Sequence, residues 1–198
     1  MNKWLMYFCI TLCCFCGTIT ITIAQINSYG ISTGIGKGTI LKQSLDGDAS
    51  YDILTGYTLG VIYNRKMNDI IHLHTSINWY NNSVVITPAF YPGINLAPKS
   101  YALQMIYIPL YLRMNLSKYF FITGGFTGDI DVTKHNQITD QSGLGASIGA
   151  GFEMAVSNSF SIQLNPYMNF HGLILSHKDK YPERLLDTGI KLNLVINK

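Results

Sequence analysis

Two histidines, His72 and His74, have the spacing that a pair of metal ligands on one strand would use. Residues i and i+2 of a β-strand face the same side, so both imidazoles could reach one ion. The sequence supplies no plausible third ligand. We therefore predict no metal and no cofactor, and we expect both rings to hydrogen-bond to neighbouring side chains. The segment Asp46-Gly47-Asp48 looks like part of a calcium loop but lacks the other ligands, which favours a polar turn.

The serines and histidines could in principle support acyl transfer or deacylation. The candidates are Ser142, Ser176, His135, His171 and His177. A catalytic serine needs a histidine within hydrogen-bond reach that is oriented by a third group. Ser176 and His177 are adjacent, and adjacent residues of a strand face opposite sides. We predict that the protein is not an enzyme and has no catalytic residues; the alternative is a lipid A-modifying enzyme of the outer membrane.

Four charged residues stand out because they lie inside apolar, alternating segments. They are Arg113, Glu153, Asp187 and Lys191. If these segments are strands around a shared lumen, the four charges project into it, and charges removed from water are normally paired. We predict a structural charge network in the lumen. A path for protons or a substrate is the alternative.

Residues 1–24 have the pattern of a cleaved signal peptide. Lys3 supplies a positive start, Trp4 to Phe15 an apolar run, and Thr22-Ile23-Ala24 a small-residue cleavage site. A membrane-spanning helix is the alternative, but the apolar run is shorter than the ~20 residues that such a helix needs. The predicted organisation is a signal peptide over 1–24 and one domain over 25–198.

Composition excludes several classes of function. All the cysteines lie within the predicted signal peptide: Cys9, Cys13, Cys14 and Cys16. The mature chain therefore has no thiol for a disulfide, a nucleophile or a metal site. The formal net charge of the whole chain is +3, and removal of Lys3 lowers it further. This charge is too small to indicate binding of nucleic acid.

The elements that would position these residues are strands, because eight segments alternate between apolar and polar residues. They span 29–36, 56–64, 71–79, 101–114, 119–129, 143–154, 160–170 and 184–198. The last is the clearest: Leu192 and Leu194 fall on one face, and Asp187, Gly189 and Lys191 on the other. An apolar face opposite a polar or glycine face is typical of a strand between lipid and a polar lumen.

The links between these segments are sorted by length. Short polar turns follow the second, fourth and sixth segments at 66–69, 115–118 and 157–159, and longer links lie near 41–52, 81–98, 130–142 and 173–183. Outer-membrane barrels place short turns and both termini in the periplasm and long loops outside. Because no open sheet edge persists in hydrocarbon, the first strand must pair with the eighth. We predict an all-β fold, an eight-stranded antiparallel up-and-down transmembrane β-barrel with short periplasmic turns and longer outer loops.

The lumen of such a barrel is only wide enough to hold side chains, which argues against a general diffusion porin. Glycines on the inner face of three strands could make room for large inward groups such as Tyr107, Tyr111 and Arg113. Aromatic residues near strand ends are expected to form girdles at the two membrane interfaces. They are Tyr29, Tyr57, Tyr63, Trp79, Tyr101 and Phe160.

Three segments carry a resemblance to a known family. Residues 105–113 read MIYIPLYLR, 120–126 read FFITGGF and 143–153 read GLGASIGAGFE. They resemble, in order, the "L-E-I-P-L-L-L-K", "aromatic-x-x-x-G-G/P" and "G-x-x-x-G-x-G-aromatic-E" strands of the PorT-like outer-membrane β-barrel family of Bacteroidota. One departure is Tyr107, which replaces the family's acidic residue, so that the lumen pair of this acid with Arg113 is missing.

The resemblance implies residence in the outer membrane and, for the family's best-known members, a part in protein secretion and gliding. Asp187, Gly189, Leu192 and Leu194 match the assembly signal that the outer-membrane insertion machinery reads. The usual terminal aromatic residue is missing, because the chain ends Ile196-Asn197-Lys198.

We predict an integral outer-membrane protein that is a structural or protein-interaction component of the cell envelope. The expected partners are outer-membrane lipid and lipopolysaccharide, the insertion machinery, and envelope or secretion proteins; no nucleic acid is expected, and the barrel is expected to be monomeric. The link 81–98, with Phe90 and Tyr91, is the expected contact surface, or else a loop folded over the barrel mouth. A soluble, small-ligand-binding barrel of the lipocalin type, with apolar residues inside, is a further alternative.

Overall fold

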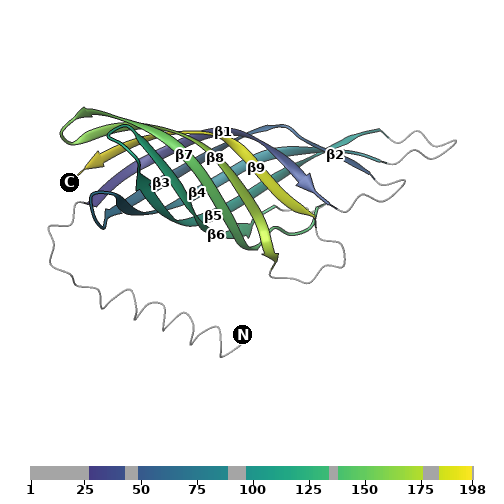
Figure 1. The fold of residues 1–198 in the computed structure, drawn as a ribbon. Helices are drawn as coiled ribbons and strands as arrows, with labels where there is room; N and C mark the ends of the chain where they lie inside the picture. Colours follow the sequence, from purple (N-terminus) through teal and green to yellow (C-terminus); the bar gives the residue numbers. More distant parts are fainter. Residues whose placement is uncertain (1–26, 43–48, 89–96, 134–137, 176–182, 198) are drawn as a thin grey trace.

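The described residues form one ring of antiparallel strands (Figure 1). The computed structural model describes residues 27–42, 49–88, 97–133, 138–175 and 183–197. Within them lie nine strands: β1 (Asn27–Leu41), β2 (Ser50–Ile53), β3 (Thr55–Lys66), β4 (Ile71–Thr87), β5 (Lys99–Asn115), β6 (Phe120–Asp131), β7 (Gly143–Ser157), β8 (Phe160–Leu175) and β9 (Arg184–Asn197). Their order is β2-β4-β3-β1-β9-β8-β7-β6-β5, and a pairing of β4 with β5 closes the ring. In these same residues, no helix is long and apolar enough to span a membrane.

Strands β2 and β3 together form one interrupted strand of the barrel wall. Only Leu54 separates them, and both pair antiparallel with β4. The register changes by one residue between Ile53↔Val84 and Tyr57↔Asn81, which is the irregularity of a β-bulge. With β2 and β3 counted as one strand, the described part of the chain has eight strands around the ring. The predicted eight-stranded, up-and-down barrel is therefore confirmed.

The first and last strands close the ring along almost their full length, in an antiparallel ladder between β1 and β9. On the lumen side of this joint, Ser28 Oγ donates to Asn197 Oδ1 over 2.8 Å. Ser32 Oγ donates to Asn193 Oδ1 over 2.7 Å. The joint is thus held by side-chain hydrogen bonds in addition to its backbone ladder.

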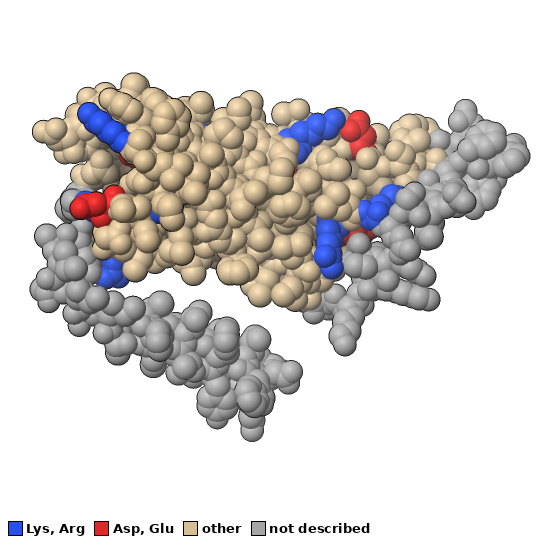
Figure 2. Space-filling view, in the orientation of Figure 1, with Lys and Arg blue, Asp and Glu red and all other residues tan. Residues whose placement is uncertain are grey.

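The outer face of the ring is apolar over a broad band. Ile31, Ile77, Leu110, Phe126 and Ile148, from five different strands, are each more than half exposed. Figure 2 shows charged side chains on either side of an uncharged band on the visible face. Such a surface would be a large apolar patch in water, whereas in a bilayer it is the contact with lipid. A soluble barrel of the lipocalin type does not fit, because the outward side chains along this band are apolar and exposed, where a soluble barrel would present polar residues to water.

Several of the predicted girdle aromatics pair with one another on this outer face. The rings of Tyr29 and Tyr63, at the periplasmic end of β1 and β3, have centroids 5.4 Å apart. Tyr57 and Trp79, further along the wall, meet edge-on at 5.6 Å. The pairs join neighbouring strands, and the first lies where an interface girdle is expected.

The three predicted short turns join β3 to β4, β5 to β6 and β7 to β8. In the first, Asn68 Oδ1 accepts hydrogen bonds from the backbone N–H of Ile70 (2.9 Å) and of Ile71 (2.7 Å). Asparagine favours turns because its side chain can bond to nearby backbone in this way. Lys66 Nζ lies 2.6 Å from Asp69 Oδ1, and this hydrogen bond lowers the pKa of the Asp69 carboxyl below its usual 3.8.

Two predicted long links are wrong in extent, because strands continue beyond the lipid band. Residues 81–87, expected in a link, belong to β4. Residues 50–52, at the end of the link predicted near 41–52, belong to β2. Outside the hydrocarbon the outer face of a strand can be polar, so the apolar alternation that marks a membrane strand disappears there. The inner face stays apolar, and Val84 is fully buried. Phe90, Tyr91, Asp46-Gly47-Asp48 and the predicted signal peptide lie outside the described residues.

Candidate functional site

An ion pair lies in the lumen near its periplasmic end. Arg113 of β5 donates from Nη2 to Glu153 Oε2 of β7 and from Nε to Asn115 Oδ1 over 2.9 Å. Its guanidinium also lies 3.9 Å over the ring of Phe121. Arg113 is buried, whereas 22% of the Glu153 side chain is exposed. Two of the four charges singled out in the sequence therefore meet here.

His72 and His74 both face the lumen, and each is held by an asparagine. His74 Nδ1 lies 2.5 Å from Asn64 Oδ1, and the imidazole stacks on Tyr111 with ring centroids 5.6 Å apart. His72 Nε2 lies 3.2 Å from Asn115 Nδ2. In the described residues, no group of three His, Cys, Asp or Glu side chains is placed to hold a metal ion.

Lys191 and Asp187, the other two charges, do not form an ion pair within the described structure. Lys191 Nζ instead lies 4.2 Å from the ring centroid of Tyr167 and 5.2 Å from that of Tyr107. Inward positions four residues apart on a strand are about 13 Å apart. Tyr167 pairs with Gly189 and so lies at the level between the two charges. The cation is therefore placed against aromatic faces, which attract it through their quadrupoles.

A second polar cluster lies further toward the outer end of the lumen. His171 Nδ1 is 3.2 Å from Asp129 Oδ1, and both side chains are fully buried. Asp187 is also fully buried, and Tyr167 and Asn169 are its polar neighbours. The sequence did not single out Asp129, because the glycines of β6 obscure which of its residues face inward. The alternation along β6, which places Thr127 and Asp129 on the inner face, could have identified Asp129 as a lumen residue.

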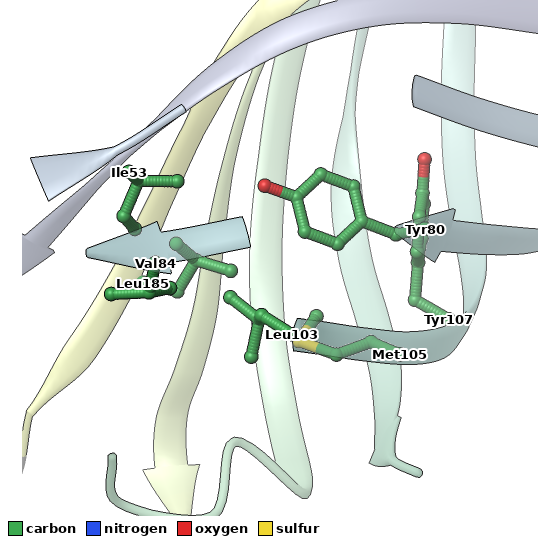
Figure 3. Close-up of a cluster of buried hydrophobic side chains, with 7 residues drawn as sticks. All are labelled: Ile53, Tyr80, Val84, Leu103, Met105, Tyr107 and Leu185. Carbon is green, nitrogen blue, oxygen red and sulfur yellow. The ribbon is translucent and has the colours of Figure 1, made fainter. Parts of the chain in front are cut away.

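The outer part of the lumen is filled by apolar side chains. The buried members are Ile53, Tyr80, Val84, Leu103, Met105, Tyr107 and Leu185, which are at most 3% exposed. In Figure 3, the side chains of Ile53, Val84 and Leu185 lie together at one side and the rings of Tyr80 and Tyr107 at the other. Gln141, from the link between β6 and β7, is fully buried and accepts a hydrogen bond from Leu185 N over 2.9 Å. This apolar plug was not predicted, since the sequence rules expect a polar lumen.

Inward glycines provide the space for some of these lumen side chains. A Cβ at Gly36 would lie 2.7 Å from the Tyr167 hydroxyl, and one at Gly189 would lie 2.9 Å from the same oxygen. A Cβ at Gly34 would lie 2.9 Å from Cγ of Lys191. The close approach of these groups to the barrel wall therefore requires glycine.

The groups needed for acyl transfer are not brought together in the described structure. Ser142 lies at the outer mouth, where its Oγ accepts a hydrogen bond from Asp131 N over 3.0 Å. His171 is inside the lumen against Asp129 and forms no hydrogen bond with Ser142. A catalytic histidine must reach its serine directly. Ser176, His135 and His177 lie outside the described residues.

The residues of the predicted insertion signal all lie on β9. Asp187 and Gly189 face the lumen, whereas Leu192, 40% exposed, and Leu194 face outward. Strand β9 is the C-terminal half of the closing joint. The same residues thus belong to the ring closure and to the predicted signal.

Comparison with known proteins finds the same architecture. The family model described as "Outer membrane protein beta-barrel domain" matches residues 15–167. The outer membrane protein OprG from Pseudomonas aeruginosa is 10% identical, with 88% of this chain and 95% of that chain covered and a TM-score of 0.56. Ail, the attachment invasion locus protein of Yersinia pestis, is 13% identical, with 84% of this chain and 98% of that chain covered and a TM-score of 0.48. No curated protein matches. At such identities the likeness to OprG supports the fold alone.

Proposed function

The chain belongs to the outer membrane protein beta-barrel domain family, and from this membership we propose that it is a non-enzymatic, non-conducting component of the cell envelope. The family places the chain in the outer membrane. The observation that supports the finer proposal is the filled lumen. The Arg113–Glu153 pair lies near its periplasmic end, and the apolar plug occupies its outer end. A barrel filled in this way would offer its surfaces to partners but no path to a solute.

We extend this proposal to the partners. The barrel would lie as a monomer among phospholipid and lipopolysaccharide, after removal of a signal peptide over 1–24 and insertion through the signal on β9. The likeness of 105–113, 120–126 and 143–153 to PorT-like strands supports a link to protein secretion. The long strands at the outer end, which continue to Thr87 on β4 and start at Lys99 on β5, would carry the contact surface for envelope or secretion proteins.

The first test of this proposal is electrical. The purified protein, inserted into planar bilayers, is expected to give no stable conductance steps, because side chains fill the lumen at both ends. Heat-modifiable migration on a gel shows in the same sample that the barrel is folded, and an open porin serves as the positive control. Stable, reproducible channels from the folded protein would contradict the proposal of a closed barrel.

The second test is capture of a partner in intact cells. A photo-reactive residue replaces Ser100, which is exposed at the outer end of β5, and a matched one replaces Leu110, which faces lipid on the same strand. We expect a discrete cross-linked envelope protein from position 100 and none from position 110. A secretion component in the product supports the finer proposal. The absence of any product that is specific to position 100 would contradict an interaction role for this end.

A further inference from the structure

The lipid-facing wall of the barrel contains a groove that plays no part in the pairing of the strands. It has a volume of about 630 Å³ and runs across neighbouring strands from β9 to β5. Its lining includes Ile31, Thr33, Leu59, Val61, Trp79 and Leu192. The small Thr33 stands directly between Leu59 and Leu192 in the ladders of β1, and this leaves the wall hollow at its centre.

The groove opens into the hydrocarbon of the membrane, which restricts what can fill it. Nearly all of its lining is apolar, and it lies within the uncharged outer band. The polar part of the lining is small, with the Thr33 hydroxyl at its centre, so a water molecule would find few hydrogen-bond partners there. An empty hollow would lose the dispersion contacts of its walls. An acyl chain is the group that the surrounding medium supplies. The volume of the groove lies within the range of about 300–1,000 Å³ that is usual for binding sites of small molecules.

Beyond the periplasmic end of the groove, four positions along β3 from Val61, lies a cation suited to a phosphate group, Arg65. Along β3, the outward residues continue from Val61 to Tyr63, which stacks with Tyr29, and then to Arg65. Lys66 is engaged by Asp69, whereas Arg65 forms no ion pair within the described part of the chain. Arginine presents a planar fork of donors that matches phosphate oxygens. The tyrosine pair is of the type found at the boundary between headgroups and hydrocarbon.

The distance between the cation and the groove matches one leaflet. Arg65 and Leu59 are six positions apart on β3, which is about 20 Å along the strand. With the usual strand tilt of about 35–45°, this distance is about 15 Å along the membrane normal. That length is half of a hydrocarbon core of about 30 Å. A phosphate at Arg65 therefore places the end of its acyl chain beside Leu59 and Trp79.

We propose that this groove binds one acyl chain of an anionic phospholipid of the periplasmic leaflet, with its phosphate held by Arg65. The site deepens the proposed function by naming one lipid partner, and it rests on residence of the barrel in the outer membrane. The bound lipid fills the hollow at Thr33 and lies along the joint of β1 and β3.

Trp79 gives a direct readout of the occupant. The chain has two tryptophans, so a Trp4→Phe variant leaves Trp79 as the sole reporter. This full-length variant is folded into phosphatidylcholine vesicles that contain a rising fraction of phosphatidylglycerol brominated on its acyl chains, or of equally brominated phosphatidylcholine. We expect about fivefold stronger quenching at low fractions by the anionic lipid, the preference that one arginine near a membrane surface supplies.

Matched variants separate the groove from general contact with lipid. Arg65→Gln is expected to abolish the preference for the anionic lipid, whereas Lys37→Gln, at the outer end of the neighbouring strand, keeps it. Thr33→Phe fills the groove and is expected to reduce quenching by both lipids. A reporter on the far wall, made by Ile148→Trp with Trp79→Phe, is expected to show no preference.

The result that overturns the inference is equal quenching of Trp79 by both lipids, or a preference that survives Arg65→Gln. A cysteine introduced beside Trp79, as in Ile77→Cys with the four cysteines of residues 1–24 replaced by serine, gives a further test. Its cross-linking into a dimer would also overturn the inference, since a second copy would then cover the groove. Heat-modifiable migration of each sample reports insertion separately. Failure to insert therefore counts against membrane residence, and an inserted, non-conducting barrel without preference counts against the lipid site alone.

Discussion

Gly189→Val is expected to prevent the barrel from closing. A Cβ at this position would overlap the carbonyl oxygen of Ile35 and would lie 2.6 Å from Cα of Gly36 and 2.9 Å from the Tyr167 hydroxyl. Two of these three atoms belong to the backbone of β1, so a change of rotamer cannot relieve the clash. Overpacking costs typically about 1–3 kcal/mol and occasionally more. At the closing joint we expect a loss of about 3 kcal/mol or more in the free energy of unfolding.

The loss is measured as the fraction of protein with heat-modifiable migration after refolding into vesicles, and by unfolding in urea. Gly124→Val is the matched control, because the atom nearest to its Cβ position is Ser147 O at 4.0 Å. This control is expected to fold like the parent. If both variants closed equally well, the close approach at Gly189 would not be a requirement of the ring.

Leu192→Lys is expected to block insertion into the membrane. Leu192 faces lipid on β9, opposite Thr33 on one side and Leu164 on the other. A lysine on the lipid face costs about 2–4 kcal/mol near the bilayer midplane and about 0–1 kcal/mol near the interface. The matched variant is Ile196→Lys, which lies near the periplasmic end of the same strand and is 58% exposed.

We expect Leu192→Lys to stay largely in the unfolded, unmodified band and Ile196→Lys to fold almost as the parent does. Refolding yield in vesicles and membrane fractionation in cells give the two readouts. Equal yields for the two lysines would show that Leu192 does not lie at the depth that the apolar band indicates.

The sequence predicted the barrel because period-two alternation is a strong signal wherever one face meets lipid. The alternation of β9 places Asp187 and Lys191 in the lumen and Leu192 in lipid, as the structure has them. The same rule failed at residues 81–87, where the outer face lies beyond the hydrocarbon and no longer has to be apolar. Strand β2 was missed for the same reason and because it has only four residues.

The contacts inside the lumen were less predictable, because a period of two gives the face of a residue but not its partner across the ring. Signs of charge were enough to predict a network of the four lumen charges, but not that Arg113 would be the partner of Glu153. They could not show that Lys191 would be held by Tyr167, which depends on which strands face each other at one level. Nor could the sequence show the contacts of Tyr107, which replaces the acidic residue that would pair with Arg113 in the PorT-like family. Tyr107 lies in the apolar plug and beside Lys191, six positions along β5 from Arg113.

The joint between β1 and β9 also bears on the order in which the barrel forms. Its tie between Ser32 and Asn193 connects residues 161 positions apart, so closing it costs more chain entropy than forming any hairpin of the ring. Ser28, Ser32 and Gly36 recur every fourth residue and face Asn197, Asn193 and Gly189.

A slip of β9 by two residues would keep its apolar side in lipid but would lose both serine ties and set a side chain against Gly36. A ring closed out of register is therefore less stable and can reopen, whereas the correct register is stabilised by the two serine–asparagine hydrogen bonds. The register of the closing joint, and with it the stagger of the strands around the barrel, is thus set by three small residues of β1, which are Ser28, Ser32 and Gly36.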